Sequence, residues 1–147
     1  MRFLKKLLGI LPIQYASAHC DVPCGIYDPK PAQIAAATVL TMVQKINALE
    51  KTGDDKEAKL NYKNSLTRMI WTKEEHARKC KEEILILWTD YFKPEHLGQF
   101  PDLHDMIWKT SKLCSQNKQK IDEMLAKELV ESVNTIAELF EMSKTSK

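Results

Sequence analysis

The residues best suited to metal chemistry lie close together near the N-terminus, in the run His19-Cys20-Asp21-Val22-Pro23-Cys24-Gly25-Ile26-Tyr27-Asp28-Pro29. Two prolines and a glycine in this run disfavour a helix and favour a compact hook. Because three residues separate Cys20 from Cys24, a tight turn can bring both thiolates to one metal ion. A structural zinc site usually has four protein side chains, whereas this segment offers three.

Further donors become available if the chain is cut before His19. The new N-terminus then supplies an amine, and Cys20 supplies a deprotonated amide nitrogen. Two nitrogens and two thiolates make a square-planar set that suits Ni(II) or Cu(II). The His19 imidazole can reach an axial position, and the anionic donors bring Ni(III) within reach. The spacing alone therefore predicts a redox-active metal site, and it leaves open a Cys20–Cys24 disulfide in a secreted protein.

Residues 1–18 have the outline of a cleavable leader. They contain three basic and no acidic residues, then an apolar stretch, and they end in Ala16-Ser17-Ala18, which resembles a signal peptidase site. The apolar stretch is too short to span a bilayer, so we expect no stable membrane association. A cut after Ala18 makes His19 the new N-terminus. We therefore predict a leader over 1–18 and a mature domain over 19–147, with the hook at 19–29 and a helical part at 30–147.

Composition indicates one helical domain. The chain has 147 residues, of which 44% are apolar, so it can bury a core of its own. Glycine and proline are scarce, which leaves long stretches with nothing to break a helix. The formal charge is +2, and removal of the three positive charges of the leader leaves −1. A nearly neutral body argues against nucleic acid as a partner.

Four amphipathic stretches follow the hook. The pattern predicts helices over 30–51, from 55–60 to 92, from Pro101 through Cys114, and over 119–143. Four such helices with short connections favour an all-α fold, an antiparallel up-and-down four-helix bundle. The apolar positions that mark the four stripes include Ile34, Leu60, Ile84, Ile107, Ile121 and Phe140.

Several polar residues along the helices are assigned structural roles. We expect Cys80 and Cys114 to be reduced core residues, because a free cysteine packs as a small hydrophobic group. The charged run Lys73-Glu74-Glu75 is expected on a solvated face. His96 and His104 fall in or near the third connection, where a capping or packing role is expected for each.

The hook resembles the nickel-hook motif His-Cys-x-x-Pro-Cys-Gly-x-Tyr-x-Pro of the nickel superoxide dismutase family, and it matches every fixed position. A second block is also similar to that family, namely Leu87-Trp88-Thr89-Asp90-Tyr91-Phe92-Lys93-Pro94 with His96, followed by Phe100-Pro101-Asp102-Leu103-His104. The similarity extends from His19 to about Leu113, and more weakly to the C-terminus.

This resemblance implies an oxidoreductase that converts two superoxide radicals to dioxygen and hydrogen peroxide through Ni(III)/Ni(II) cycling, with one nickel ion per subunit. It implies that His19, Cys20 and Cys24 are the nickel ligands. Tyr27 and Tyr91 are expected to screen the open axial face.

The resemblance also places Asp21 and Lys93 near the mouth of the site. A lysine there raises the local concentration of an anionic substrate.

The resemblance further implies a homohexamer of four-helix bundles. One departure concerns the axial histidine, which in the family is often braced by a glutamate and an arginine. The matching positions here are Ala35 and His76. Partners of a ligating imidazole orient and tune it, so the support of His19 differs in this chain.

Two other functions remain open at this level. One is a non-catalytic nickel or copper binding protein, since the same donors bind both metals tightly. The other is a small secreted helical interaction protein with a Cys20–Cys24 disulfide. The family resemblance favours a cytoplasmic enzyme trimmed by a processing peptidase, while the Ala-Ser-Ala ending leaves export as the alternative.

Overall fold

The computed structural model describes residues 25–145, and every regular element within that range is helical. Four helices are long and one is short, and a single π-helical turn continues the second. Their bounds are α1 Lys30–Asn47, α2 Lys56–Ile86, η1 Leu87–Tyr91, α3 Pro94–Gln99, α4 Leu103–Gln119 and α5 Glu123–Thr145. No helix in the described range is long and apolar enough to cross a membrane.

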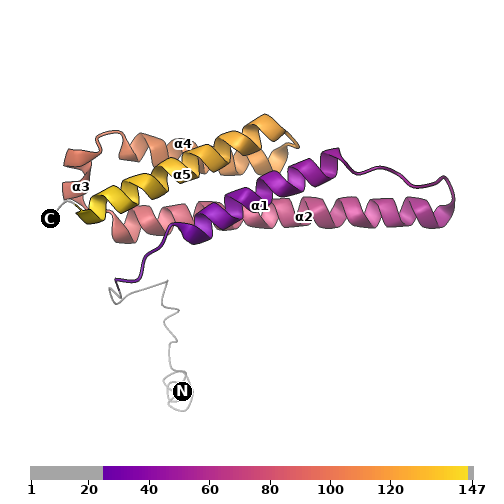
Figure 1. Ribbon diagram of the computed structural model, residues 1–147, viewed down its shortest axis with the longest axis horizontal. Coiled ribbons are helices and arrows are strands. Elements are labelled where there is room, and N and C mark those ends of the chain that lie inside the picture. The colour runs from indigo at the N-terminus through magenta and orange to yellow at the C-terminus, as the bar shows by residue number, and fades with distance from the viewer. Residues whose placement is uncertain (1–24, 146–147) are drawn as a thin grey trace, which may run out of the picture.

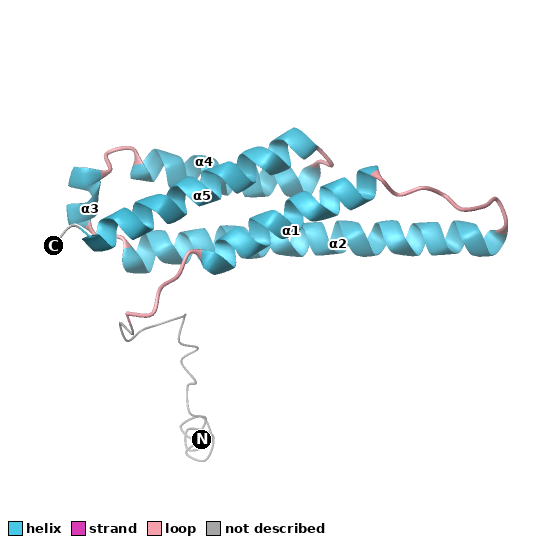
Figure 2. Cartoon of the chain, viewed as in Figure 1, coloured by secondary structure: helices cyan, strands magenta, loops and turns pink. Residues whose placement is uncertain are grey.

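The four long helices form the predicted bundle (Figure 1). Helix α1 packs against α2 and α5, and α4 packs against the same two helices. Successive long helices run in opposite directions, and the loops between them are drawn in pink in Figure 2. The up-and-down arrangement is therefore confirmed. At 31 residues α2 is the longest described helix, and its first turns extend beyond α4 and α5.

The core takes residues from all four long helices, but three of the expected stripe positions are wrong. Ile34 is 55% exposed, Leu60 57% and Ile121 45%. On α1 the buried face consists of alanines and valines, which turns Ile34 toward solvent. Leu60 lies on the overhanging turns of α2, and Ile121 precedes the first turn of α5.

The first helix is shorter than predicted, the start of the second is confirmed, and one short helix was not predicted. The first helix ends at Asn47 rather than near 51, and asparagine favours helix ends because its side chain competes for backbone hydrogen bonds. The second begins at Lys56, within the predicted range of 55–60, and there the carboxylate of Asp55 accepts a 2.8 Å hydrogen bond from the Ala58 N–H. The short helix α3 was not predicted. Its Pro94 looks like a stop signal but also suits the first turn of a helix.

Lys73 is buried, contrary to the expected solvated face. Its side chain is 1% exposed, and its ammonium group donates to the backbone oxygens of Asn117 and Lys118, the latter at 2.9 Å. These carbonyls belong to the last turn of α4, which has no further helical N–H to bind them. Burial lowers the pKa of Lys73. The lysine therefore acts as a cap that joins α2 to the end of α4.

Cys80 and Cys114 are free thiols in the core, as predicted. Both are fully buried. A hydrogen bond to Cys114, together with burial, raises the pKa of the Cys80 thiol above its usual range. A thiol held in its protonated form is a poor nucleophile and a poor metal ligand.

Candidate functional site

The site is built around the point where α2 changes its winding. The last turn, Leu87–Tyr91, is π-helical, and the Phe92 N–H closes it with a 2.9 Å bond to the Leu87 carbonyl oxygen. Single π turns inside α-helices occur often at functional sites. Leu87 and Phe92 remain in the core, while Tyr91 is only half-buried. The extra residue thus brings Tyr91 to the edge of the core.

Aromatic contacts hold the Tyr91 ring from three sides. The Phe140 ring of α5 lies 4.3 Å away between centroids, and the Phe92 ring 5.1 Å away in an edge-on arrangement. His96 of α3 stacks on Tyr91 at 5.8 Å with an interplanar angle of 12°. Three elements therefore fix the plane of this ring, because aromatic pairs favour such offset and edge-on geometries.

Tyr27 completes the cluster from the N-terminal side. Its ring centroid lies 5.6 Å from that of Tyr91, with an interplanar angle of 57°. Just before it, Gly25 has a φ of +69°, a left-handed conformation that strains any residue with a side chain. The structure thus brings together two residues that the sequence predicted for the site, although they lie far apart along the chain.

The Tyr91 hydroxyl is anchored by a residue that sequence reasoning missed. It lies 2.7 Å from the Ser143 hydroxyl, which is 2.7 Å from the Phe140 carbonyl oxygen. Ser143 is 7% exposed and occupies the last turns of α5. The signal available in the sequence was a small polar residue on the otherwise apolar buried face of α5.

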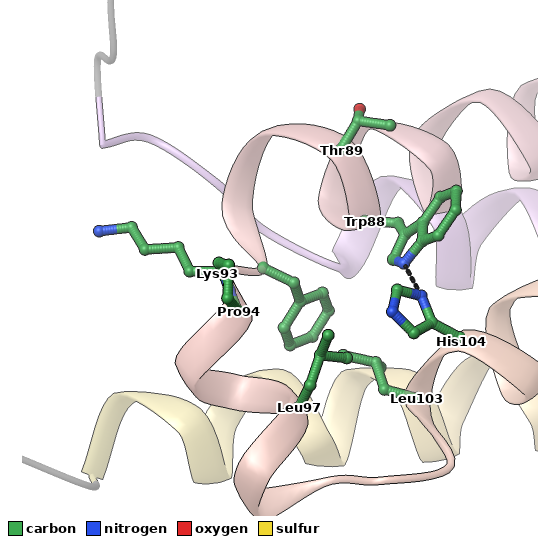
Figure 3. Close-up of a pocket in the computed structure, with 8 residues that line it drawn as sticks. Trp88, Thr89, Lys93, Pro94, Leu97, Leu103 and His104 are labelled. Carbon is green, nitrogen blue, oxygen red and sulfur yellow. Dashed lines mark hydrogen bonds between the residues drawn. The ribbon is translucent and has the colours of Figure 1, made fainter.

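Lys93 follows the π turn and is exposed. It borders a pocket of about 290 Å³ that Trp88, Leu97 and His104 also line. In Figure 3 its side chain extends away from Trp88 and His104, so its ammonium group is free to face solvent.

Both histidines of this region have structural roles, as expected. His96 Nδ1 accepts a 3.0 Å bond from the Lys93 N–H, which caps α3. The Trp88 indole N–H donates to His104 Nδ1 at 3.0 Å and meets that ring edge-on (Figure 3). Each bond requires the neutral histidine with its proton on Nε2.

The expected metal donors His19, Cys20 and Cys24, and Asp21 with them, lie outside the described residues. Within 25–145 the structure contains no group of three or more His, Cys, Asp or Glu side chains able to hold a metal ion. Ala35 is buried in the core. His76 is half-buried, and its Nδ1 donates to the Thr72 carbonyl oxygen at 2.9 Å.

Comparisons with known proteins agree with this geometry. Residues 14–144 match the family model of nickel-containing superoxide dismutase. The chain is 34% identical over 124 residues to a superoxide dismutase [Ni] of Streptomyces coelicolor, a match that covers 84% of this chain and 86% of that protein.

Solved structures give the same result. A native nickel superoxide dismutase structure at 1.30 Å superposes with a TM-score of 0.73 at 32% identity, covering 87% of this chain and 100% of that one. A structure of a Ni-containing superoxide dismutase, with nickel ligation corresponding to the oxidised state, gives the same TM-score, identity and coverage. The chain therefore belongs to the nickel-containing superoxide dismutase family.

Proposed function

We propose that His19, Cys20 and Cys24 hold the nickel of this superoxide dismutase, and that Tyr27 and Tyr91 together screen its open side. The observation that carries this proposal is the Tyr27–Tyr91 contact. Tyr27 comes three residues after Cys24 along the chain. The contact therefore ties the base of the hook to a tyrosine whose ring three other aromatic groups hold in place.

The donor set fits nickel. Two thiolates, an N-terminal amine and a deprotonated amide are strong planar donors, and they favour a metal that accepts such geometry. Nickel held by these donors would supply the one-electron redox chemistry by which two superoxide ions and two protons give dioxygen and hydrogen peroxide. Family membership favours this reaction over the alternative of a non-catalytic nickel or copper binding protein.

The chain supplies access and selectivity around the metal. The packed rings of Tyr27 and Tyr91 leave room for a diatomic anion and hinder larger reductants. The exposed Lys93 ammonium group, next to the π turn, attracts superoxide. The family resemblance also assigns Asp21, which lies outside the described residues, to the mouth of the site.

Removal of residues 1–18 after Ala18 activates the enzyme, because the amine donor exists only when His19 begins the chain. A processing peptidase carries out this cut. We place the mature enzyme in the cytoplasm, with export as the alternative that the Ala-Ser-Ala ending of the leader suggests.

Several exposed apolar side chains support assembly into a homohexamer. Leu60 and Trp71, which are 57% and 71% exposed, lie about three turns apart on α2 and so share one face. Trp108 on α4 is 60% exposed. Large exposed apolar groups mark protein interaction surfaces, and neighbouring copies of this chain would cover these side chains.

The test compares three chains produced with nickel: one that begins at His19, the full precursor, and the His19 chain carrying Cys20→Ser. We expect bound nickel and dismutase activity only in the first. The matched control is Cys114→Ala in the His19 chain, which alters a buried thiol outside the hook and should keep both properties. An active precursor, or nickel retained at full activity in Cys20→Ser, would refute the ligand assignment.

A further inference from the structure

We propose that Ser143 sets the direction of the Tyr91 hydroxyl, so that Tyr91 offers only a hydrogen-bond acceptor to the metal site and thereby weakens the binding of anions there. This inference rests on the proposed place of Tyr91 beside the nickel. Ser143 touches no reacting atom and acts through Tyr91, so it is a positioning residue.

The direction follows from a count of hydrogen atoms. A serine hydroxyl has one proton to donate. The Phe140 carbonyl oxygen, 2.7 Å from Ser143 Oγ, can only accept, so it takes that proton. Ser143 Oγ is therefore an acceptor toward Tyr91, and the Tyr91 hydroxyl donates its only proton along their 2.7 Å contact. Toward every other group in the site, the Tyr91 oxygen can then only accept a hydrogen bond.

Packing makes this arrangement hard to reverse. Ser143 is 7% exposed, so little water reaches it to replace either bond. Phe140, which supplies the carbonyl oxygen, is fully buried, and its ring lies 4.3 Å from the Tyr91 ring. The ammonium group of Lys144 lies 4.1 Å from the centre of the Phe140 ring and covers it from outside. Phe140 and Ser143 of α5 therefore fix the ring and the hydroxyl of Tyr91, respectively.

The chemical consequence is weak binding of anions. Superoxide, azide and halide ions accept hydrogen bonds and do not donate them. A tyrosine whose proton is already donated to Ser143 gives such ions no bond, whereas it still accepts one from water or from the O–H of hydrogen peroxide. Anions are thus held weakly, which keeps the site free for turnover and disfavours inhibitory ions.

The first measurement concerns the hydroxyl itself. Raman spectra of the nickel-loaded protein report whether a tyrosine donates or accepts, through the intensity ratio of its Fermi doublet. The contribution of Tyr91 is obtained by subtracting the spectrum of Tyr91→Phe. We expect a donor signature in the wild type and in Ser143→Thr, which keeps a hydroxyl, and its loss in Ser143→Ala. An unchanged signature in Ser143→Ala would overturn the proposal.

The second measurement uses azide as the probe anion. With Ser143 replaced by alanine, the Tyr91 proton is free to turn toward a bound ion, and we expect azide to inhibit dismutation at about tenfold lower concentration. Ser143→Thr should restore the wild-type value. Equal azide inhibition in wild type and Ser143→Ala, with the Raman signature changed, would overturn the role in weakening anion binding. The nickel content of Cys20→Ser separately tests the ligand assignment, so the two failures are distinguishable.

Discussion

The two ends of the bundle are built differently. At the end that holds Tyr91, four aromatic rings and the Ser143 hydroxyl contact one side chain, and the π turn and α3 are folded against the same place. At the other end, the first turns of α2 extend beyond α4 and α5 and leave Leu60 exposed (Figure 1). One end makes its contacts within the chain, and the other leaves apolar surface of α2 exposed. The fixed ring of Tyr91 and the exposed first turns of α2 therefore lie at opposite ends of this helix.

The largest effect is expected where the contacts are densest. Phe140→Ala removes a fully buried ring and the main support of Tyr91, and should lower the free energy of unfolding by about 3–5 kcal/mol. Urea unfolding measures this. The control on the same helix is Met124→Ala, since Met124 is 73% exposed and should change stability little. Similar losses of unfolding free energy in Phe140→Ala and Met124→Ala would contradict the expectation that the contacts around Tyr91 matter most.

Lys73→Met should lower the free energy of unfolding by about 1–3 kcal/mol, since the last carbonyls of α4 lose their buried donor. The exposed Lys63 on the same helix provides the control, Lys63→Met.

The effect of Lys73 also depends on pH. Its pKa is lowered in the folded protein, so as pH rises toward 10.5 the unfolded chain binds more protons, and stability gains with pH in that window. Urea unfolding of wild type and Lys73→Met across alkaline pH should show this gain only in the wild type. If the stability of wild type and Lys73→Met changed with pH in the same way, the pH effect would not come from Lys73.

At the overhanging end, Asp55→Ala removes the cap of α2 and should cost about 1 kcal/mol. Asp54→Ala is the matched control, because Asp54 is exposed and forms only a surface ion pair with Lys51. Thermal unfolding of the two variants checks the difference. If Asp55→Ala lowered stability as much as Phe140→Ala, the start of α2 would contribute as much to stability as the contacts around Tyr91.

The smallest effect on unfolding of the single chain is expected for Trp71→Ser, below about 0.5 kcal/mol, because Trp71 is 71% exposed. The same change should weaken assembly. Mass determination in solution at several concentrations measures it, and an unchanged mass would remove Trp71 from the proposed interface.

The helices were predictable because periodicity reports which face is buried. The short helix α3 was not, since Pro94 and Gly98 are usual in connections, and only the His96 ring shows that the backbone is capped there. The burial of Lys73 also escaped prediction, because its partners are backbone carbonyls of another helix, and no pattern in residue types records them.

Some residues of the candidate site could be predicted from the sequence, and others could not. Tyr27 and Tyr91 could be named from a resemblance in motif, and the structure confirms that they meet. Ser143 could not, because its importance depends on the direction of a single hydroxyl proton. The hook residues His19, Cys20 and Cys24 lie outside the described range, so their role stays a prediction.

The π turn has a consequence for how this site tolerates change in length. Each residue of an α-helix advances the chain by about 100°, so deletion of either exposed residue, Thr89 or Asp90, would turn Tyr91 away from Tyr27 and Phe140. Substitution at these two positions leaves the backbone path intact. The length of this turn therefore matters more for the position of the Tyr91 ring than the side chains of Thr89 and Asp90 do.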